Sequence, residues 1–399
     1  MGPEIQTRAK VDLQAGSCTP EPHTNNRLNP EYQRNLGLDW VLIGDHGLRA
    51  GCSIAIFVAL FRLFTLILSV IAVGLYPPLA NGGFSPAQAF FGELVPFLAL
   101  IGATAMVAFF EHRHLSDFNL AGPRPGANFI SGLAMGFLAL SMLIAVLAIG
   151  GWLRFGPVAL SGSAVAKYAL IWGCTFIVVA CFEEGMFRCY LQFTFARSVN
   201  FWWALAIVGT VCFDLVLRSR GGLGIVAFFW MQSMSAIKGN GMWGVFAVAL
   251  LGLGPCLRLH LLRANESGFW QAAWVTSTLF GYVHVGNNGE NWIGIFAAAA
   301  IGFVFCVSIW LTGSAWWAIG CHAGWDWGET YFYGTADSGI AAKGHYLSAS
   351  PLGNALWSGG TDGPEGSVLV LGAILLLLVM LVLIYRPHTS PINNSNCAH

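Results

Sequence analysis

The sequence predicts an all-α protein, a polytopic bundle of transmembrane helices with about eight to ten membrane crossings. Of its 399 residues, 56% are hydrophobic and only 10% are charged, whereas an ordinary soluble domain carries about 25% charged residues. So few charges cannot cover a surface that faces water. The apolar residues also form continuous stretches of about 20, the length that crosses a bilayer as a helix, without the alternation typical of a transmembrane β-barrel.

The charge balance and the residue composition limit the classes of partner that the protein can have. Lys plus Arg and Asp plus Glu both total 19, so the formal charge is zero and no basic excess favours nucleic acid. The chain contains 49 Gly and 16 Trp, and these residue types serve close helix packing and the membrane boundary. The lipid bilayer is therefore the expected environment, and nucleic acid is excluded as a partner.

The spanning helices can be placed in order along the chain, and a segment of uncertain organisation separates two groups of them. That segment, 222–262, is interrupted by SAIKGNG and by Gly254 and Pro255, and is predicted to hold two crossings or re-entrant pieces. The clear candidates are 52–76, 89–110, 129–152, 165–187, 292–311 and 368–385, and the less apolar ones are 201–217, 269–284 and 315–332.

Three parts follow from this pattern: a polar N-terminal segment over 1–50, one membrane domain over 51–386 and a short polar tail over 387–399. Basic residues in short loops set the orientation, because cytoplasmic loops carry an excess of Lys and Arg. Arg49 precedes the first helix, the next loop (YPPLANGGFSPA) has no basic residue, and Arg386 follows the last helix. We therefore expect an integral multi-pass protein whose N- and C-termini are both cytoplasmic.

An ionisable side chain inside an apolar stretch costs free energy to insert into the bilayer. Such a residue therefore usually has a polar partner or a function. In FIVVACFEEGMFRCYLQF, Glu184 and Arg188 are four apart and share a helix face, whereas the adjacent Glu183 points elsewhere. One interpretation is a solvated ion pair at a helix end. The other is that the pair orients Glu183 as a general base near the cytoplasmic face.

Two more segments carry a potential acid, base or donor. In STLFGYVHVGNNGEN, His284 lies at the polar end of an apolar stretch, and in WAIGCHAGWDW, His322 and Asp326 share one helix face. Each has a structural interpretation, His284 as an interfacial residue and His322 as a ring held in one tautomer by the carboxylate. Taken with Glu183, they also suit hydrolysis, with Glu183 and His284 activating water and His322 with Asp326 stabilising the oxyanion.

The sequences EEGMFR, FGYVH and HAGWD resemble the three motifs of the CAAX protease and bacteriocin-processing (CPBP, or Abi) family, which includes the type II CAAX prenyl endopeptidases. The likeness covers about 180–327, within a protease-like core over about 165–335. It implies a glutamate-type intramembrane endopeptidase, a hydrolase. Eukaryotic relatives trim prenylated CAAX proteins, and bacterial relatives serve in bacteriocin processing or immunity. Glu184 and Arg188 fall on the family's supporting pair.

The same resemblance implies that Glu183 and His284 activate water and that His322 and Asp326 form the oxyanion hole. Asp326 departs from the Asn typical of relatives with CAAX activity, and a carboxylate stabilises an oxyanion only when protonated. Asp326 is alternatively an orienting partner of His322, with His322 or Asn287 as the donor. A second departure is the 101 positions between Glu183 and His284, which predict an insertion at about 207–269 that adds an even number of crossings or none.

We expect a metal-free site, because no HExxH motif is present. Zinc bound by Glu183, His284 and His322 is the alternative, since catalytic zinc commonly takes three protein ligands. The expected substrate is a membrane-associated peptide or protein, lipidated or otherwise anchored. Two other functions compete with the peptidase: a catalytically silent scaffold or immunity protein, and a proton-coupled transporter, which would need a polar pathway and inverted repeats.

Overall fold

The computed structural model describes residues 43–44, 47–75, 86–222, 224, 240–287 and 289–385. These residues are mainly helical, which confirms the predicted all-α class. Two short antiparallel strand pairs accompany the helices, β1 (Ile43–Gly44) with β2 (Gly47–Leu48) and β3 (Leu153–Phe155) with β4 (Ala349–Pro351). The predicted tail over 387–399 and most of the predicted N-terminal segment lie outside the described residues.

The helices follow the predicted stretches closely. The α-helices are α2 (Ala50–Leu75), α3 (Pro86–Phe110), α4 (Pro125–Ile149), α5 (Ser163–Glu184), α6 (Gln192–Ala196), α7 (Phe201–Ser219), α9 (Met242–Leu261), α10 (Ser267–His284), α11 (Trp292–Thr312), α12 (Trp316–Asp326), α13 (Ala355–Ser358) and α14 (Val370–Ile384). Short 3₁₀ turns form η2 (Leu115–Asp117) and η5 (Pro364–Gly366), and π-helices form η3 (Gly185–Leu191) and η4 (Trp327–Tyr333).

The described part of the chain has seven helices that are long and apolar enough to cross a membrane, and α14 is a shorter apolar helix. The predicted count of eight to ten crossings therefore exceeds the seven helices of spanning length in the described residues. Large apolar side chains such as Leu66 and Phe109 are exposed on the outer helices. In water such a surface would be unfavourable, so the protein is an integral multi-pass membrane protein.

One predicted interruption is wrong. Gly254 and Pro255 were expected to break the segment 222–262, but α9 runs through both to Leu261. Proline removes one backbone donor, and neighbouring helices can compensate for such a loss within a membrane bundle. The remaining question of a second crossing falls partly on 225–239, outside the described residues.

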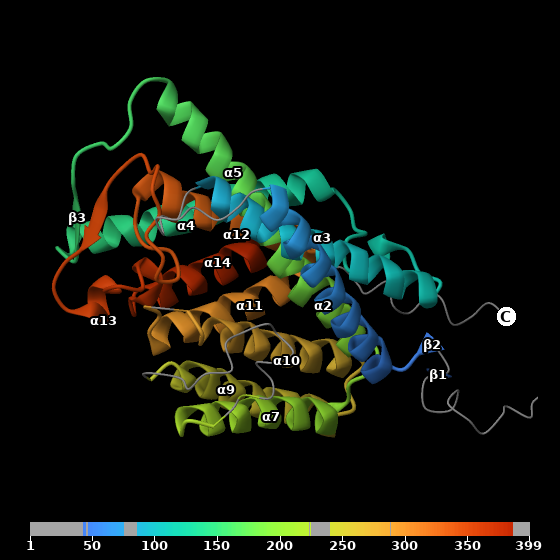
Figure 1. Cartoon of the computed structure of the whole chain (residues 1–399). Helices are drawn as coiled ribbons and strands as arrows, with labels where there is room; N and C mark the ends of the chain where they lie inside the picture. The colour runs from blue at the N-terminus through green and yellow to red at the C-terminus, as the bar shows by residue number, and fades with distance from the viewer. Residues whose placement is uncertain are drawn as a thin grey trace, which may run out of the picture.

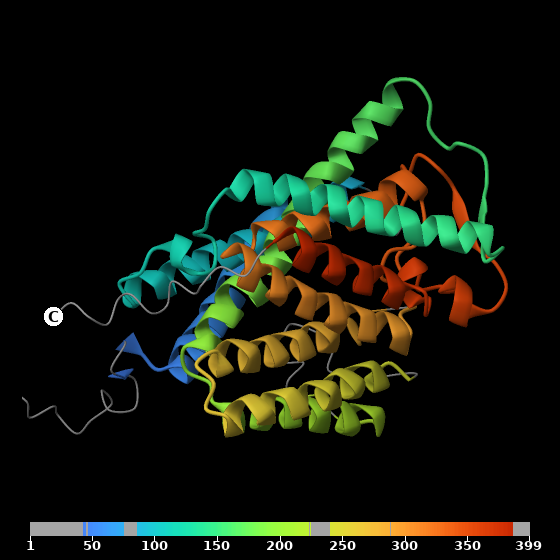
Figure 2. The ribbon, with the colours of Figure 1, turned by 180° about the vertical axis from the view of Figure 1, so that it is seen from behind.

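The helices stack in successive layers, with α14, α11 and α10 following one another and the pair α7 and α9 outermost (Figure 1). The same order is seen from behind, where α5 crosses the bundle obliquely (Figure 2). Helix α5 packs against α3 on one side and α12 on the other. The segments that carry the three motifs, α5, α10 and α12, are therefore brought into one region by packing of helices that are distant in sequence.

Helices α4 and α12 approach so closely that glycine is needed at their crossing. Gly132 and Gly136 on α4, and Gly320 and Gly324 on α12, each face backbone of the other helix. A Cβ added at Gly136 would overlap the carbonyl oxygen of Cys321. Both helices thus present glycines four residues apart, the spacing that lets membrane helices pack backbone to backbone. This contact fixes the position of α12, which carries His322 and Asp326.

We expect Gly136→Ala to lower the melting temperature of the detergent-solubilised protein, because overpacking costs about 1–3 kcal/mol. Gly126→Ala in the same helix is the matched control, since no atom lies within 4 Å of a Cβ built there. Alanine should leave that position unchanged or stabilise it by up to about 1 kcal/mol. Equal melting temperatures for the two variants would contradict the close contact.

The segment between η4 and α14 folds back onto the start of α11, and Asp362 makes the attachment. The Asn291 backbone N–H donates to Asp362 Oδ2 over 3.1 Å, and the Gly339 N–H donates to the Asp362 carbonyl over 2.9 Å. Asp362 is fully buried, and burial raises the pKa of its carboxyl to about 7, against the opposing effect of the Asn291 bond. The neutral carboxyl is therefore the form that suits the fold.

Asp362 should make stability depend on pH. A raised carboxyl pKa contributes stability that is complete below the unfolded pKa near 4 and is lost as pH rises through about 7. Asp362→Asn keeps the acceptor for Asn291 and removes the ionisation. We expect the melting temperature of the variant minus that of the wild type to rise between pH 6 and pH 8. A difference that stays constant over this range would refute the assignment.

Candidate active site

The two helices that carry acidic motif residues change from α-helical to π-helical winding immediately after those residues. Helix α5 ends at Glu184 and continues as the π-helix η3, and α12 ends at Asp326 and continues as the π-helix η4. π-Helical turns are rare and occur frequently at functional sites, because they re-aim side chains within a continuous helix. The backbone conformation alone therefore indicates that both segments are candidates for a functional site.

The Glu184 carboxylate connects the first and third motifs. Its Oε2 lies 3.1 Å from Arg188 Nε, and both side chains are fully buried. Its Oε1 lies 2.8 Å from His322 Nδ1 on α12. One carboxylate is therefore shared between a guanidinium and an imidazole, which fixes the position of the His322 ring.

Aromatic rings surround the Arg188 guanidinium. Its Cζ lies 4.2 Å from the centre of the Phe280 ring and 5.5 Å from that of Phe305. A Cβ at Gly302 would overlap Nη2, so the glycine makes room for the side chain. The contact with Glu184 is an ion pair without hydrogen-bond alignment. The ring faces therefore supply part of the compensation that a buried cation requires.

His322 contacts carboxylates through both ring nitrogens. Nε2 lies 3.3 Å from Asp326 Oδ2 and 3.8 Å from Glu183 Oε2, while Nδ1 faces Glu184. A neutral imidazole has one donor nitrogen, whereas the imidazolium has two. Donation to both neighbouring carboxylates requires the doubly protonated ring. The arrangement holds a directed N–H donor beside Glu183.

His284 lies at the last position of α10, and its tautomer follows from one contact. Nδ1 lies 2.7 Å from the Phe280 carbonyl oxygen, which can only accept a hydrogen bond. Nδ1 therefore carries the hydrogen, and in the neutral ring Nε2 keeps its lone pair. The second motif thus presents a base nitrogen.

The residues predicted for chemistry reach one cavity of about 280 Å³, although they come from three separate segments. Glu183, His284, His322 and Asp326 all line it, together with Asn287, whose side chain is exposed. The buried ion pair of the first motif does not line the cavity and lies behind the His322 ring. The candidate catalytic residues are thus brought together, and the supporting pair occupies the layer behind them.

Six further polar residues of the cavity wall were not among the predicted site residues: Glu93, Thr175, Thr330, Asp337, Ser338 and Glu365. Glu93, the single acid of α3, had a usable signal, because an isolated acid in an apolar helix is a candidate functional residue. Asp337 had none, since it belongs to a Gly- and Ser-rich segment whose path depends on tertiary contacts, and Glu365 had only its place in GPEGS, the sequence that leads into the last helix.

The zinc alternative needs three donor atoms close together. The donor atoms of Glu183, His284 and His322 do not form a group within 4.8 Å in the part of the chain that the structure describes. In addition, both nitrogens of His322 face carboxylates. The residues present therefore do not fit the zinc site considered from the sequence, and the metal-free site stays a prediction.

A comparison with known protein families finds a match that includes the second and third motifs. Residues 255–328 match the family model described as Type II CAAX prenyl endopeptidase Rce1-like. We refer to residues 255–328 as the Rce1-like stretch. The match includes FGYVH and HAGWD, and it confirms the resemblance seen in the motifs. These residues are therefore similar to a CAAX-type prenyl endopeptidase domain.

The Rce1-like match begins within α9 and ends at the start of η4, so the Glu183 motif lies outside it. The structure nevertheless places that motif against the Rce1-like stretch through the contact of Glu184 with His322. A search of curated proteins and of solved structures finds no significant match to the chain.

Removing the buried cation should destabilise the protein strongly. In Arg188→Met, the carboxylate of Glu184 would lose its guanidinium, and breaking a buried pair costs about 3–5 kcal/mol. Arg197→Met is the matched control, because Arg197 pairs with Glu111 at a partly exposed position where Arg113 also contacts that carboxylate. The Glu111 side chain is itself buried, but it keeps Arg113 in the control, so the expected loss of stability is smaller than in Arg188→Met. Thermal unfolding in detergent should separate the two variants, and similar losses would contradict the role of Arg188.

Proposed function

We propose that this protein is a metal-free glutamate-type intramembrane endopeptidase that hydrolyses a peptide bond of a membrane-associated substrate. One observation carries the proposal: the motif residues from α5, α10 and α12 line a single cavity within and beside an Rce1-like stretch. A base, a directed donor and a free volume between them are the elements that hydrolysis requires.

In the proposed reaction, a water molecule held between Glu183 and His284 attacks the substrate carbonyl. Glu183 accepts the water proton, while His284 Nε2 accepts a hydrogen bond from the same water, because its Nδ1 is committed to Phe280. The carbonyl oxygen becomes an oxyanion in the tetrahedral intermediate. Glu183 then returns the proton to the leaving nitrogen, the C–N bond breaks, and the products are a carboxylic acid and an amine.

His322 is the proposed oxyanion donor, through the Nε2–H that the oxyanion would share with Asp326. Asp326 lies 3.3 Å from this nitrogen, which favours an orienting role over direct contact with the oxyanion. Glu184 holds the opposite nitrogen and is itself held by Arg188. The two carboxylates and the guanidinium would therefore act as positioning groups for one donor.

The remaining cavity wall supports an anchored substrate. It includes apolar residues of α5, α11 and α14, among them Phe176, Ile301 and Leu377. Such a wall can accept an acyl or prenyl chain, or an apolar peptide segment. With both termini on the cytoplasmic side, as loop charges predict, the site would receive lipidated or membrane-anchored substrates from the cytoplasmic face.

Glu183→Gln should abolish cleavage without loss of the fold, because the amide keeps the shape of the side chain and cannot take a proton. The assay is cleavage of lipidated and membrane-anchored peptides in liposomes, with and without chelator, with His284→Ala alongside. Glu266→Gln is the control, an exposed acid at the start of α10. Cleavage should persist in the control and in chelator.

An active Glu183→Gln variant would overturn the mechanism, and loss of wild-type cleavage in chelator would restore a metal. No cleavage by folded wild type across a broad library would favour the silent scaffold. Proton uptake coupled to solute movement in the same liposomes would favour the transporter.

Variants of Asp326 separate the two roles considered for it. If Asp326 orients His322, Asp326→Asn keeps an acceptor for Nε2 and should retain kcat within about tenfold, whereas Asp326→Ala should lose about 100-fold or more. If a protonated Asp326 donates to the oxyanion, wild-type activity should instead require acidic conditions that Asp326→Asn does not. A pH profile of kcat for the three proteins distinguishes these outcomes.

A further inference from the structure

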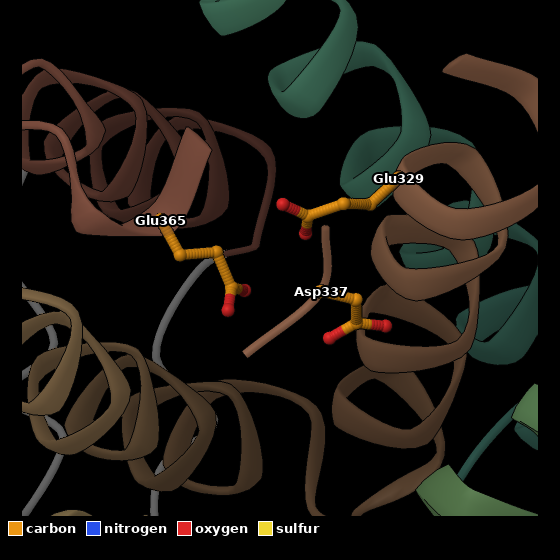
Figure 3. A group of neighbouring side chains, drawn as sticks. All are labelled: Glu329, Asp337 and Glu365. Carbon is orange, nitrogen blue, oxygen red and sulfur yellow. The ribbon is translucent and has the colours of Figure 1, made fainter. Parts of the chain in front are cut away.

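Three carboxylates meet at one wall of the cavity, apart from the residues of the proposed reaction. They belong to Glu329 on η4, Asp337 in the following segment and Glu365 on η5, and one oxygen of each lies within 4.8 Å of the others. Figure 3 shows the three side chains converging from separate elements. Asp337 and Glu365 also line the cavity of the candidate active site.

Each carboxylate has one oxygen fixed by a neutral donor, so the direction of its other oxygen is constrained. Donors that orient the ligands are typical of the layer around a metal. The donations are Trp325 Nε1 to Glu329 Oε2 over 2.9 Å, Thr330 Oγ1 to Asp337 Oδ2 over 3.0 Å, and Ser338 Oγ to Glu365 Oε2 over 3.2 Å.

The second oxygen of Glu329 is left without a partner. Glu329 is fully buried, and its Oε1 accepts no hydrogen bond among the described residues. The carboxylate points toward Asp337 and Glu365 (Figure 3). An unsatisfied buried acceptor costs about 1–3 kcal/mol, and more when charged. This atom therefore requires a ligand that the protein does not itself provide.

Positive charge from the protein is also missing around the three acids. Within the described ranges, no Lys or Arg forms an ion pair with Glu329, Asp337 or Glu365. His322 is another cationic group of the cavity, but its two ring nitrogens already contact Glu184 and Asp326. Three like charges within 4.8 Å repel one another, and this repulsion is relieved either by protonation or by a cation between them.

We propose that Glu329, Asp337 and Glu365 bind one Ca²⁺ ion. An all-oxygen, carboxylate-rich set is the choice of hard cations. Ca²⁺ holds its ligands at about 2.3–2.6 Å, so two oxygens on opposite sides of it are separated by up to about 5 Å, whereas Mg²⁺ at about 2.0–2.1 Å allows about 4 Å. Oxygens within 4.8 Å of one another can reach a single Ca²⁺ ion, and a set of three carboxylates suits Ca²⁺ better than Mg²⁺, which usually takes one or two carboxylates and keeps several waters.

The ion would fasten the segment between η4 and α14 to the helix that continues α12. Glu329 is three residues beyond Asp326 on the same helical run, whereas Asp337 and Glu365 belong to the segment that covers the cavity. Binding is a property of these three side chains alone. It therefore holds or fails independently of the proposed peptidase activity.

The first test is binding of Tb³⁺, a luminescent substitute for Ca²⁺, to the full chain in detergent after chelator treatment. Trp325 lies against Glu329 and can transfer excitation to the bound ion. We expect saturable luminescence that Ca²⁺ displaces at lower concentration than Mg²⁺ does. Absence of saturable luminescence in the folded wild type would overturn the proposal without any variant.

The second test compares Glu365→Gln and Asp337→Asn with Glu266→Gln, an exposed acid outside the cluster. Millimolar Ca²⁺ should raise the melting temperature of the wild type and of Glu266→Gln by several degrees, since a ligand that binds only the folded state stabilises it. Both cluster variants should lose this shift and at least tenfold in Tb³⁺ affinity. An undiminished shift in folded cluster variants would overturn the assignment of the site.

Discussion

The buried carboxylate of Glu184 is the interaction on which the arrangement of the site depends. It contacts Arg188 on its own helical run and His322 on α12, and thereby joins two helices whose motifs are 138 residues apart. Within a bilayer such a charged contact is viable only with full compensation. The aromatic rings of Phe280 on α10 and Phe305 on α11 contribute to that compensation, so both helices pack around one ion pair.

Polar contact alone would not set the depth of α12. That is the task of the glycines at its crossing with α4, where Gly136 and Gly324 bring the two backbones into direct contact. Van der Waals packing of this kind replaces the hydrophobic driving force that membrane helices lack between one another. Electrostatics therefore selects which residues meet, and small residues decide how closely the helices that carry them approach.

The helices and the motif residues could be predicted from the sequence because both depend on local patterns of residues. An apolar run of about 20 residues predicts a span, and the spacing of Glu184 and Arg188 predicts a shared face. It failed at Pro255, where neighbouring helices outweighed a local helix breaker. Asp337 and Glu365 were missed because their proximity to the site depends on the path of a segment attached by Asp362 to α11. No periodicity encodes that attachment.

The contribution of this segment to the cavity has a consequence for biosynthesis. A chain is made from its N-terminus, and domains take shape in the order of synthesis. His322 and Asp326 can join the earlier motif as soon as α12 packs against α4 and α5, yet the wall formed by Glu365, Val370 and Leu377 emerges last. Until the last helix has been synthesised, the cavity therefore has no far wall, whatever the state of the motif residues. Completion of the last helix marks the point at which a confined reaction volume first exists.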